Sequence, residues 1–84
     1  NEAEAIELAN QTEYGLGAAV FCKDAKYGEE VAAKLNAGNV AVNTFVKSDA
    51  RLPFGGIKNS GYGREMGSQG IHEFVNVKSV IVAS

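Results

Sequence analysis

The chain has little of the residues that carry the commonest disulfide and metal chemistries. Its 84 residues include one cysteine, one histidine, one proline and no tryptophan. A single cysteine excludes an internal disulfide and is typical of a reducing compartment, so we expect a cytoplasmic protein. One cysteine and one histidine do not form the ligand cluster that a zinc site needs, so no metal is expected.

The chain also lacks a large excess of positive or negative charge, and it lacks long apolar runs. The net charge is −2 and no basic stripe appears, which argues against a nucleic-acid partner. The longest apolar runs have only a few residues, far fewer than the roughly 20 that cross a bilayer, so no membrane partner is expected. A chain of 84 residues forms at most one small domain, which would be marginally stable alone.

Glycine, in contrast, is abundant. Four of the ten glycines lie in the thirteen residues Pro53–Glu65, whose sequence is PFGGIKNSGYGRE. Phe54, Ile57 and Tyr62 give this run apolar anchors, which indicates a shaped loop packed against another surface. Its glycine spacing fits neither the dinucleotide fingerprint nor the phosphate loop, so we expect no cofactor-binding residue in it.

The N-terminal half predicts an alternation of helices and strands. Glu2–Asn10 is rich in helix formers and Asn1 is placed to cap it. The apolar run Ala18–Cys22 predicts a buried strand, and Asn39–Asn43 predicts a second one. Between the strands we expect a helix capped by Asp24, with an apolar stripe of Tyr27, Val31 and Leu35 and an end before Gly38. This order predicts an α/β fold with a βαβ unit and parallel strands.

The C-terminal half is less regular. No period holds from Thr44 to Gly67, which predicts a long loop with a function. Gln69–Phe74 predicts a short helix. Val75–Ala83 reads as a strand that is apolar on both faces and therefore needs another sheet to pair with. We divide the chain into residues 1–75 and a terminal strand at 76–84.

The glycine-rich run resembles the C-terminal signature of the aldehyde dehydrogenase superfamily. The likeness continues through segments elsewhere in the chain: Glu4–Asn10, Tyr14–Leu16, Ala37–Gly38, Val42–Asn43 and Phe74–Lys78. Asn43–Gly56 is most similar to succinate-semialdehyde dehydrogenases. The resemblance implies the C-terminal part of a catalytic domain, made of the βαβ unit and the glycine-rich loop, ending in an oligomerisation strand.

The same resemblance implies an enzyme that oxidises an aldehyde to an acid with NAD or NADP, and a homo-oligomer. In that family the nucleophilic cysteine, the general base and the cofactor-binding residues belong to upstream segments. We therefore expect no catalytic residue in this chain, a cofactor bound by a missing upstream part, and no turnover by the chain alone. Two alternatives stay open: a dehydrogenase for another aliphatic or aromatic aldehyde, and a non-catalytic assembly module.

Three residues are candidates for substrate binding. Ser48 lies five residues before Pro53, where succinate-semialdehyde dehydrogenases have a serine that helps to hold the remote carboxylate. A hydroxyl with cationic neighbours suits a carboxylate, so Arg51 is a second candidate. Phe45 suits the wall of an aldehyde channel, although a core role fits it nearly as well.

A second set of residues is expected to support the active site. Arg64 and its neighbours can donate hydrogen bonds to a catalytic loop, and the glycines allow a tight turn beneath it. This set is Gly55, Gly56, Lys58, Ser60 and Arg64. The alternative is a plain structural loop with surface charges. Cys22 lies outside the family's nucleophile motif and is expected to be structural, and His72 is expected at a helix surface.

Overall fold

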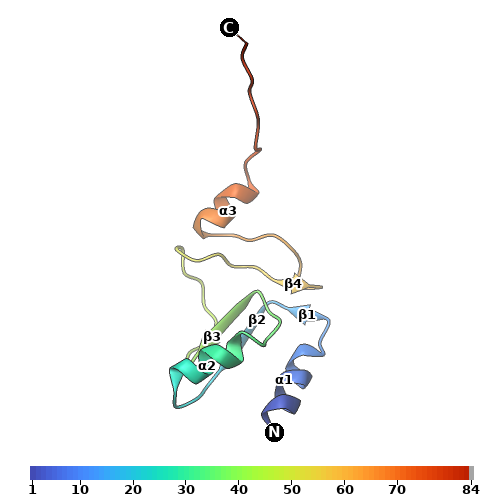
Figure 1. Ribbon diagram of the computed structural model, residues 1–84, viewed down its shortest axis with the longest axis vertical. Coiled ribbons are helices and arrows are strands. Elements are labelled where there is room, and N and C mark those ends of the chain that lie inside the picture. The colour runs from blue at the N-terminus through green and yellow to red at the C-terminus, as the bar shows by residue number, and fades with distance from the viewer. Residues whose placement is uncertain (84) are drawn as a thin grey trace.

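The computed structural model describes residues 1–83 and shows an elongated molecule (Figure 1). The helices and strands in chain order are α1 (Glu2–Asn10), β1 (Tyr14–Gly15), β2 (Gly17–Val20), α2 (Ala25–Ala32), β3 (Asn39–Val42), β4 (Ile57–Lys58) and α3 (Gly67–Glu73). The radius of gyration is 17.0 Å and the extents are 66 × 25 × 21 Å. A compact domain of this length would have a radius of gyration of about 12 Å.

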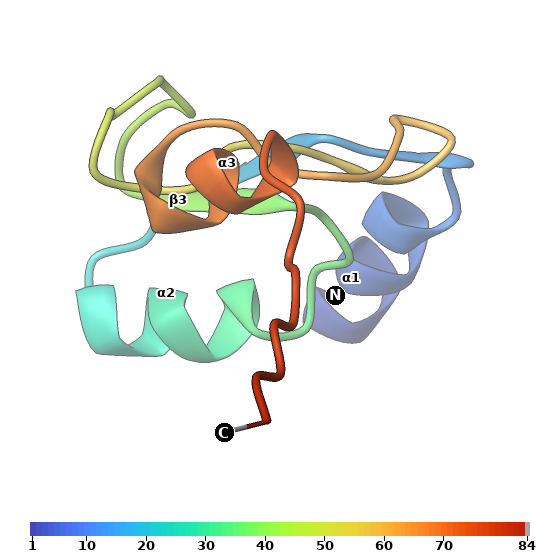
Figure 2. The ribbon, with the colours of Figure 1, turned by 90° about the horizontal axis from the view of Figure 1, so that it is seen from above.

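The βαβ unit is the organising element of the body. Strands β2 and β3 pair in parallel, with Gly17 opposite Asn39 and Val20 opposite Val42, and α2 connects them. This confirms the predicted unit, although each strand ends earlier than expected. The prediction that the first strand is buried is wrong for the chain by itself, because its residues alternate between exposed and half-buried. Helices α1 and α2 lie on the same side of the strands and leave the other face without a helix (Figure 2).

Both predicted helix caps are present. The Asn1 side chain accepts a hydrogen bond from the Glu4 amide at 2.9 Å, and Asp24 accepts one from the Lys26 amide at 3.0 Å. Helix α2 ends at Ala32, because the amides of Lys34 and Leu35 bond to carbonyls only three residues back and tighten the chain into a turn. Leu35 therefore lies beyond the helix, and the predicted stripe extends only as far as Val31.

A pairing that the sequence did not predict closes the long loop. Strand β4 pairs antiparallel with β1, with Tyr14 opposite Lys58 and Gly15 opposite Ile57. A further bridge joins Phe54 to Glu65 through two backbone hydrogen bonds of 2.7 and 2.8 Å. The segment predicted to be loop from Thr44 to Gly67 thus folds back on itself and on the start of the chain.

The predicted terminal strand has no partner within the described residues and stays a prediction. Residues 75–83 extend away from the body (Figure 1) and pair with no strand among the described residues. Val77 is 90% exposed and Ile81 is 93% exposed. A strand needs a partner to accept its backbone hydrogen bonds, and the described part of the chain offers none. Residue 84, the end of the predicted strand, lies outside the described residues, and the division at residue 75 stays a prediction.

The described residues have no apolar core. The only buried residues are four glycines: Gly15, Gly28, Gly56 and Gly70. The exposed area is 6627 Å², whereas a compact monomer of this mass would expose about 4,800 Å². Among residues 1–83, no helix is long and apolar enough to cross a membrane. The fold is therefore held by backbone pairing and polar contacts rather than by side-chain burial.

Candidate functional site

Ser48 lies on a groove beside the βαβ unit. The groove has a volume of about 590 Å³ and is lined by Leu16, Gly17, Ala18, Ala19, Val46, Lys47, Ser48 and Phe54. Most of these residues are apolar, and Ser48 and Lys47 are the two with polar side chains. We call it the Ser48 groove. It can hold a short carbon chain against its apolar wall and an anionic end near Lys47.

Phe45 lines a different hollow, which has a volume of about 270 Å³ and also includes Leu52. Its ring packs edge-to-face on Phe21, with centroids 5.6 Å apart and planes at 65°. Both rings are largely exposed. Phe45 and Ser48 thus line different hollows, which adjoin at Val46 and Lys47.

Arg51 lines neither of these hollows. Its guanidinium group donates from Nε and Nη2 to the two Asp49 carboxylate oxygens at 3.0 and 2.8 Å. Its backbone amide donates to Oδ1 of the same carboxylate at 2.9 Å. The side-chain hydrogen bonds from Arg51 hold the pKa of Asp49 below its usual range, and the same contact raises the pKa of Arg51.

The lowered pKa of Asp49 determines how its contribution to folding stability depends on pH. A carboxyl group whose pKa is lower in the folded state stabilises the fold above its unfolded pKa, which is about 3.9. That contribution is lost as the pH falls from there through the lowered folded pKa. The Asp49–Arg51 pair is therefore intact at neutral pH and is lost only under strongly acidic conditions.

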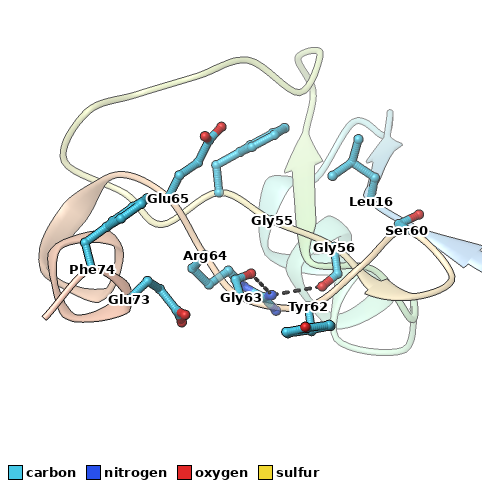
Figure 3. A pocket seen from close by; sticks show the side chains of 11 residues that line it. Leu16, Gly55, Gly56, Ser60, Tyr62, Gly63, Arg64, Glu65, Glu73 and Phe74 are labelled. Atoms are coloured by element: carbon cyan, nitrogen blue, oxygen red, sulfur yellow. Dashed lines mark hydrogen bonds between the residues drawn. The ribbon is translucent and has the colours of Figure 1, made fainter. Parts of the chain in front are cut away.

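The glycine-rich loop forms a second hollow, with a volume of about 420 Å³ (Figure 3). Arg64 crosses beneath it and donates from Nη1 to the carbonyl oxygens of Gly56 and Gly63 at 2.9 and 2.7 Å. The Gly55 carbonyl accepts a hydrogen bond from the Asn39 side chain at 3.0 Å. Arg64 thus ties the two sides of the loop to each other, and Asn39 ties the loop to β3.

Lys58 and Ser60 also bond within the chain. The Lys58 ammonium group donates to the carbonyl oxygens of Asn10 and Thr12 at 3.0 and 3.2 Å, at the end of α1. The Ser60 hydroxyl accepts a hydrogen bond from the Gly15 amide at 2.9 Å. All the polar side chains expected to support the active site therefore hold the glycine-rich loop against its own chain.

The hollow of the glycine-rich loop does not fit a dinucleotide cofactor. Glu65 and Glu73 both line it (Figure 3), and their negative charges would repel a pyrophosphate. The Nη1 atom of its one cationic side chain, Arg64, already donates to two carbonyl oxygens. These residues therefore do not form a site for NAD or NADP.

Cys22 and His72 lie where the sequence places them. The Cys22 thiol is half-buried and contacts the Asp24 carbonyl oxygen at 3.1 Å, and its amide donates to the Asn43 side chain at 2.8 Å. His72 is exposed in the last turn of α3. The described residues contain no group of three side chains suited to a metal ion.

Sequence reasoning missed the two residues that the groove and the hollow share. Leu16 and Phe54 line both the Ser48 groove and the hollow of the glycine-rich loop, and they form the wall between them. Phe54 stands directly after Pro53 in the glycine-rich run, so that motif was the signal that could have found it. Leu16 belongs to the Tyr14–Leu16 segment of the family resemblance, but no pattern gives it a role, because its place depends on the pairing of β1 with β4.

Known proteins are similar to this chain in sequence and in fold. The model of the Aldehyde dehydrogenase family matches residues 1–80. A succinate semialdehyde dehydrogenase [NAD(P)+] of Escherichia coli K12 is 47% identical over 76 residues, 90% of this chain and 16% of the relative. A chloroplastic betaine aldehyde dehydrogenase of Beta vulgaris is 50% identical over 80 residues, 95% of this chain and 16% of the relative.

Solved structures agree with these matches. A crystal structure of succinic semialdehyde dehydrogenase from Streptococcus pyogenes, in complex with NADP+, has a TM-score of 0.92 and 43% identity. That match covers 100% of this chain and 18% of the other. The chain thus spans about one sixth of the length of its relatives. By its sequence and its fold, the chain belongs to the aldehyde dehydrogenase family.

Proposed function

We propose that the chain is part of a cytoplasmic, NAD(P)-dependent enzyme that oxidises succinate semialdehyde to succinate. The family and the names of several relatives support an aldehyde oxidation. The observation that supports this choice of substrate is the Ser48 groove, whose lining includes Ser48 and Lys47 beside mostly apolar residues. The catalytic groups and the cofactor site belong, in this proposal, to other parts of a longer protein.

The chemistry of the groove favours an acid over a cation. A substrate carboxylate near Ser48 and Lys47 would accept charge-assisted hydrogen bonds, which reject analogues that lack the carboxylate. Betaine aldehyde, the substrate in the names of other relatives, carries a quaternary ammonium group that Lys47 would repel. A different aliphatic or aromatic aldehyde remains the second candidate, supported by the apolar wall alone.

Replacing Ser48 by alanine in the full-length enzyme tests this choice. Losing one hydrogen bond to a charged group removes about 1.5–3 kcal/mol, so kcat/KM for succinate semialdehyde should fall by roughly 10- to 100-fold. Butanal has the same chain length and no carboxylate, so its kcat/KM should change by less than about twofold. The matched control is Ser68→Ala, an exposed serine in α3, which should leave both values unchanged. A wild-type enzyme without preference for the acid would exclude the proposed substrate.

We further propose that the full-length protein self-associates through residues 75–83, which we call the tail. The apolar side chains of residues 75–83 contact nothing that would cover them, and Ile81 is 93% exposed. Ile81→Lys should therefore shift the full-length protein to smaller species in sedimentation velocity, because an ammonium group would have to be buried at the contact. His72→Lys, at an exposed position of α3, should leave the distribution unchanged. An unaltered distribution for Ile81→Lys would exclude the tail as the contact.

A further inference from the structure

The turn that follows Ser48 is held by one carboxylate. Asp49 accepts three hydrogen bonds from Arg51, one from the backbone amide and two from the guanidinium group, at 2.8–3.0 Å. The Asp49 carbonyl oxygen also accepts one from the Leu52 amide at 2.9 Å. Because a planar guanidinium group matches a carboxylate in a fixed orientation, the pair fixes the path of the turn.

The same turn is joined to the start of α3. The Gly67 amide donates to the Ala50 carbonyl oxygen at 3.0 Å. The turn is therefore attached both within itself and to the segment that follows the glycine-rich loop. Ser48 stands directly before this attached turn, so the direction of its side chain depends on the path of the turn.

The path of the turn puts neighbouring residues on two different hollows. Ser48 lines the Ser48 groove, whereas the next residue, Asp49, lines the smaller hollow beside Phe45. Arg51 lines neither, and its Nε and Nη2 atoms both face Asp49. To bind a substrate carboxylate through these atoms, Arg51 would have to leave Asp49 and release the turn.

We propose that Asp49 and Arg51 are positioning residues, a clamp that directs Ser48 into its groove, and that Arg51 does not itself bind the substrate. This inference rests on the proposed function. Exposed ion pairs contribute little to folding stability, so we infer the clamp from the three hydrogen bonds that fix the Asp49 carboxylate to Arg51. Small errors in the position of a binding group lower reaction rates strongly, which gives the clamp a measurable role.

Asp49→Asn in the full-length enzyme separates the clamp from a direct role of Arg51. If Arg51 bound the substrate carboxylate, freeing it from Asp49 would leave kcat/KM for succinate semialdehyde unchanged or higher. The clamp predicts a loss of about tenfold, mainly through a higher KM, with less than a twofold change for butanal. The double variant Ser48→Ala/Asp49→Asn should lose no more than Ser48→Ala alone, because both changes act through one hydroxyl. A retained kcat/KM, or fully additive losses, would overturn the clamp.

Amide hydrogen exchange tests the clamp without any substrate, and therefore independently of the proposed function. Hydrogen exchange of the Arg51 and Leu52 amides in the full-length protein should be at least several-fold faster in Asp49→Asn than in wild type, because the Arg51 amide loses its charged acceptor. Glu29→Gln, at an exposed carboxylate of α2, should leave this exchange unchanged. Unchanged exchange in Asp49→Asn would overturn the clamp. A wild-type enzyme that does not prefer the acid would instead overturn the proposed substrate, and the exchange result would still decide the clamp.

Discussion

Purified alone, the 84-residue chain is expected to show no cooperative thermal unfolding and no dehydrogenase turnover. The described residues bury no apolar side chain, and fifteen large apolar side chains are exposed. Burial of apolar surface is the dominant favourable term in folding, so the chain lacks what would offset its loss of conformational entropy. Its exposed area is about 1,800 Å² above that of a compact monomer of the same mass.

Differential scanning calorimetry and an NAD(P)H absorbance assay measure the two parts of this expectation. A chain with a normal core of this size would absorb about 60 kcal/mol in a sharp transition, whereas we expect a nearly flat trace. Full-length protein from the same preparation route serves as the positive control for both measurements. A sharp transition in a monomer would favour the assembly-module alternative, and turnover would show that catalytic groups lie within these residues.

Replacing Gly38 by alanine in the full-length protein should be the most damaging single substitution in this chain. Gly38 lies between β1 and the glycine-rich loop, and its amide donates to the Gly15 carbonyl oxygen at 3.0 Å. An added methyl group would overlap the Gly55 carbonyl group and stand 3.1 Å from the Gly56 Cα atom. These neighbours are backbone atoms, which cannot rotate away, so we expect a loss of about 3 kcal/mol or more.

The urea midpoint and the soluble yield of the full-length variant measure this loss. Gly61→Ala is the matched control, because a methyl group there would meet nothing within 4 Å. Gly61 has a φ of +112°, so alanine at that position carries backbone strain alone, of about 1–2 kcal/mol. Equal losses in the two variants would mean that the close approach at Gly38 is relieved by movement of the loop.

Local signals in the sequence predicted the local elements well. Asn1 and Asp24 cap their helices as expected, because a side-chain cap depends only on residues two or three positions away. The parallel pairing of β2 with β3 followed from the short apolar runs and the helix between them. The boundaries were less accurate, as the early end of α2 before Leu35 shows.

Features that depend on distant residues were missed or stay predictions. The pairing of Tyr14–Gly15 with Ile57–Lys58 involves two residues on each side, too few to show a periodicity. The terminal strand, predicted from β-branched residues, stays a prediction, because it requires a partner sheet that the described residues do not include.

The candidate site was predictable only in part. Ser48 was found through a family resemblance and lies on a groove. The direction of Arg51 was not predictable, because it depends on the carboxylate of Asp49. Phe45 was given either a channel wall or a core role; its ring packs on Phe21 and lines a hollow that adjoins the Ser48 groove, so its role in the site stays a prediction.

The contact of Lys58 with the end of α1 has a consequence for the order of events on the ribosome. Its partners are the carbonyl oxygens of Asn10 and Thr12, 48 and 46 residues earlier in the chain. At about 5–20 residues per second, translation delivers Lys58 roughly 2–10 s after those carbonyl groups. The nascent βαβ unit, whose paired strands are only 22 residues apart, is thus synthesised well before the lysine that fastens the first helix to the glycine-rich loop.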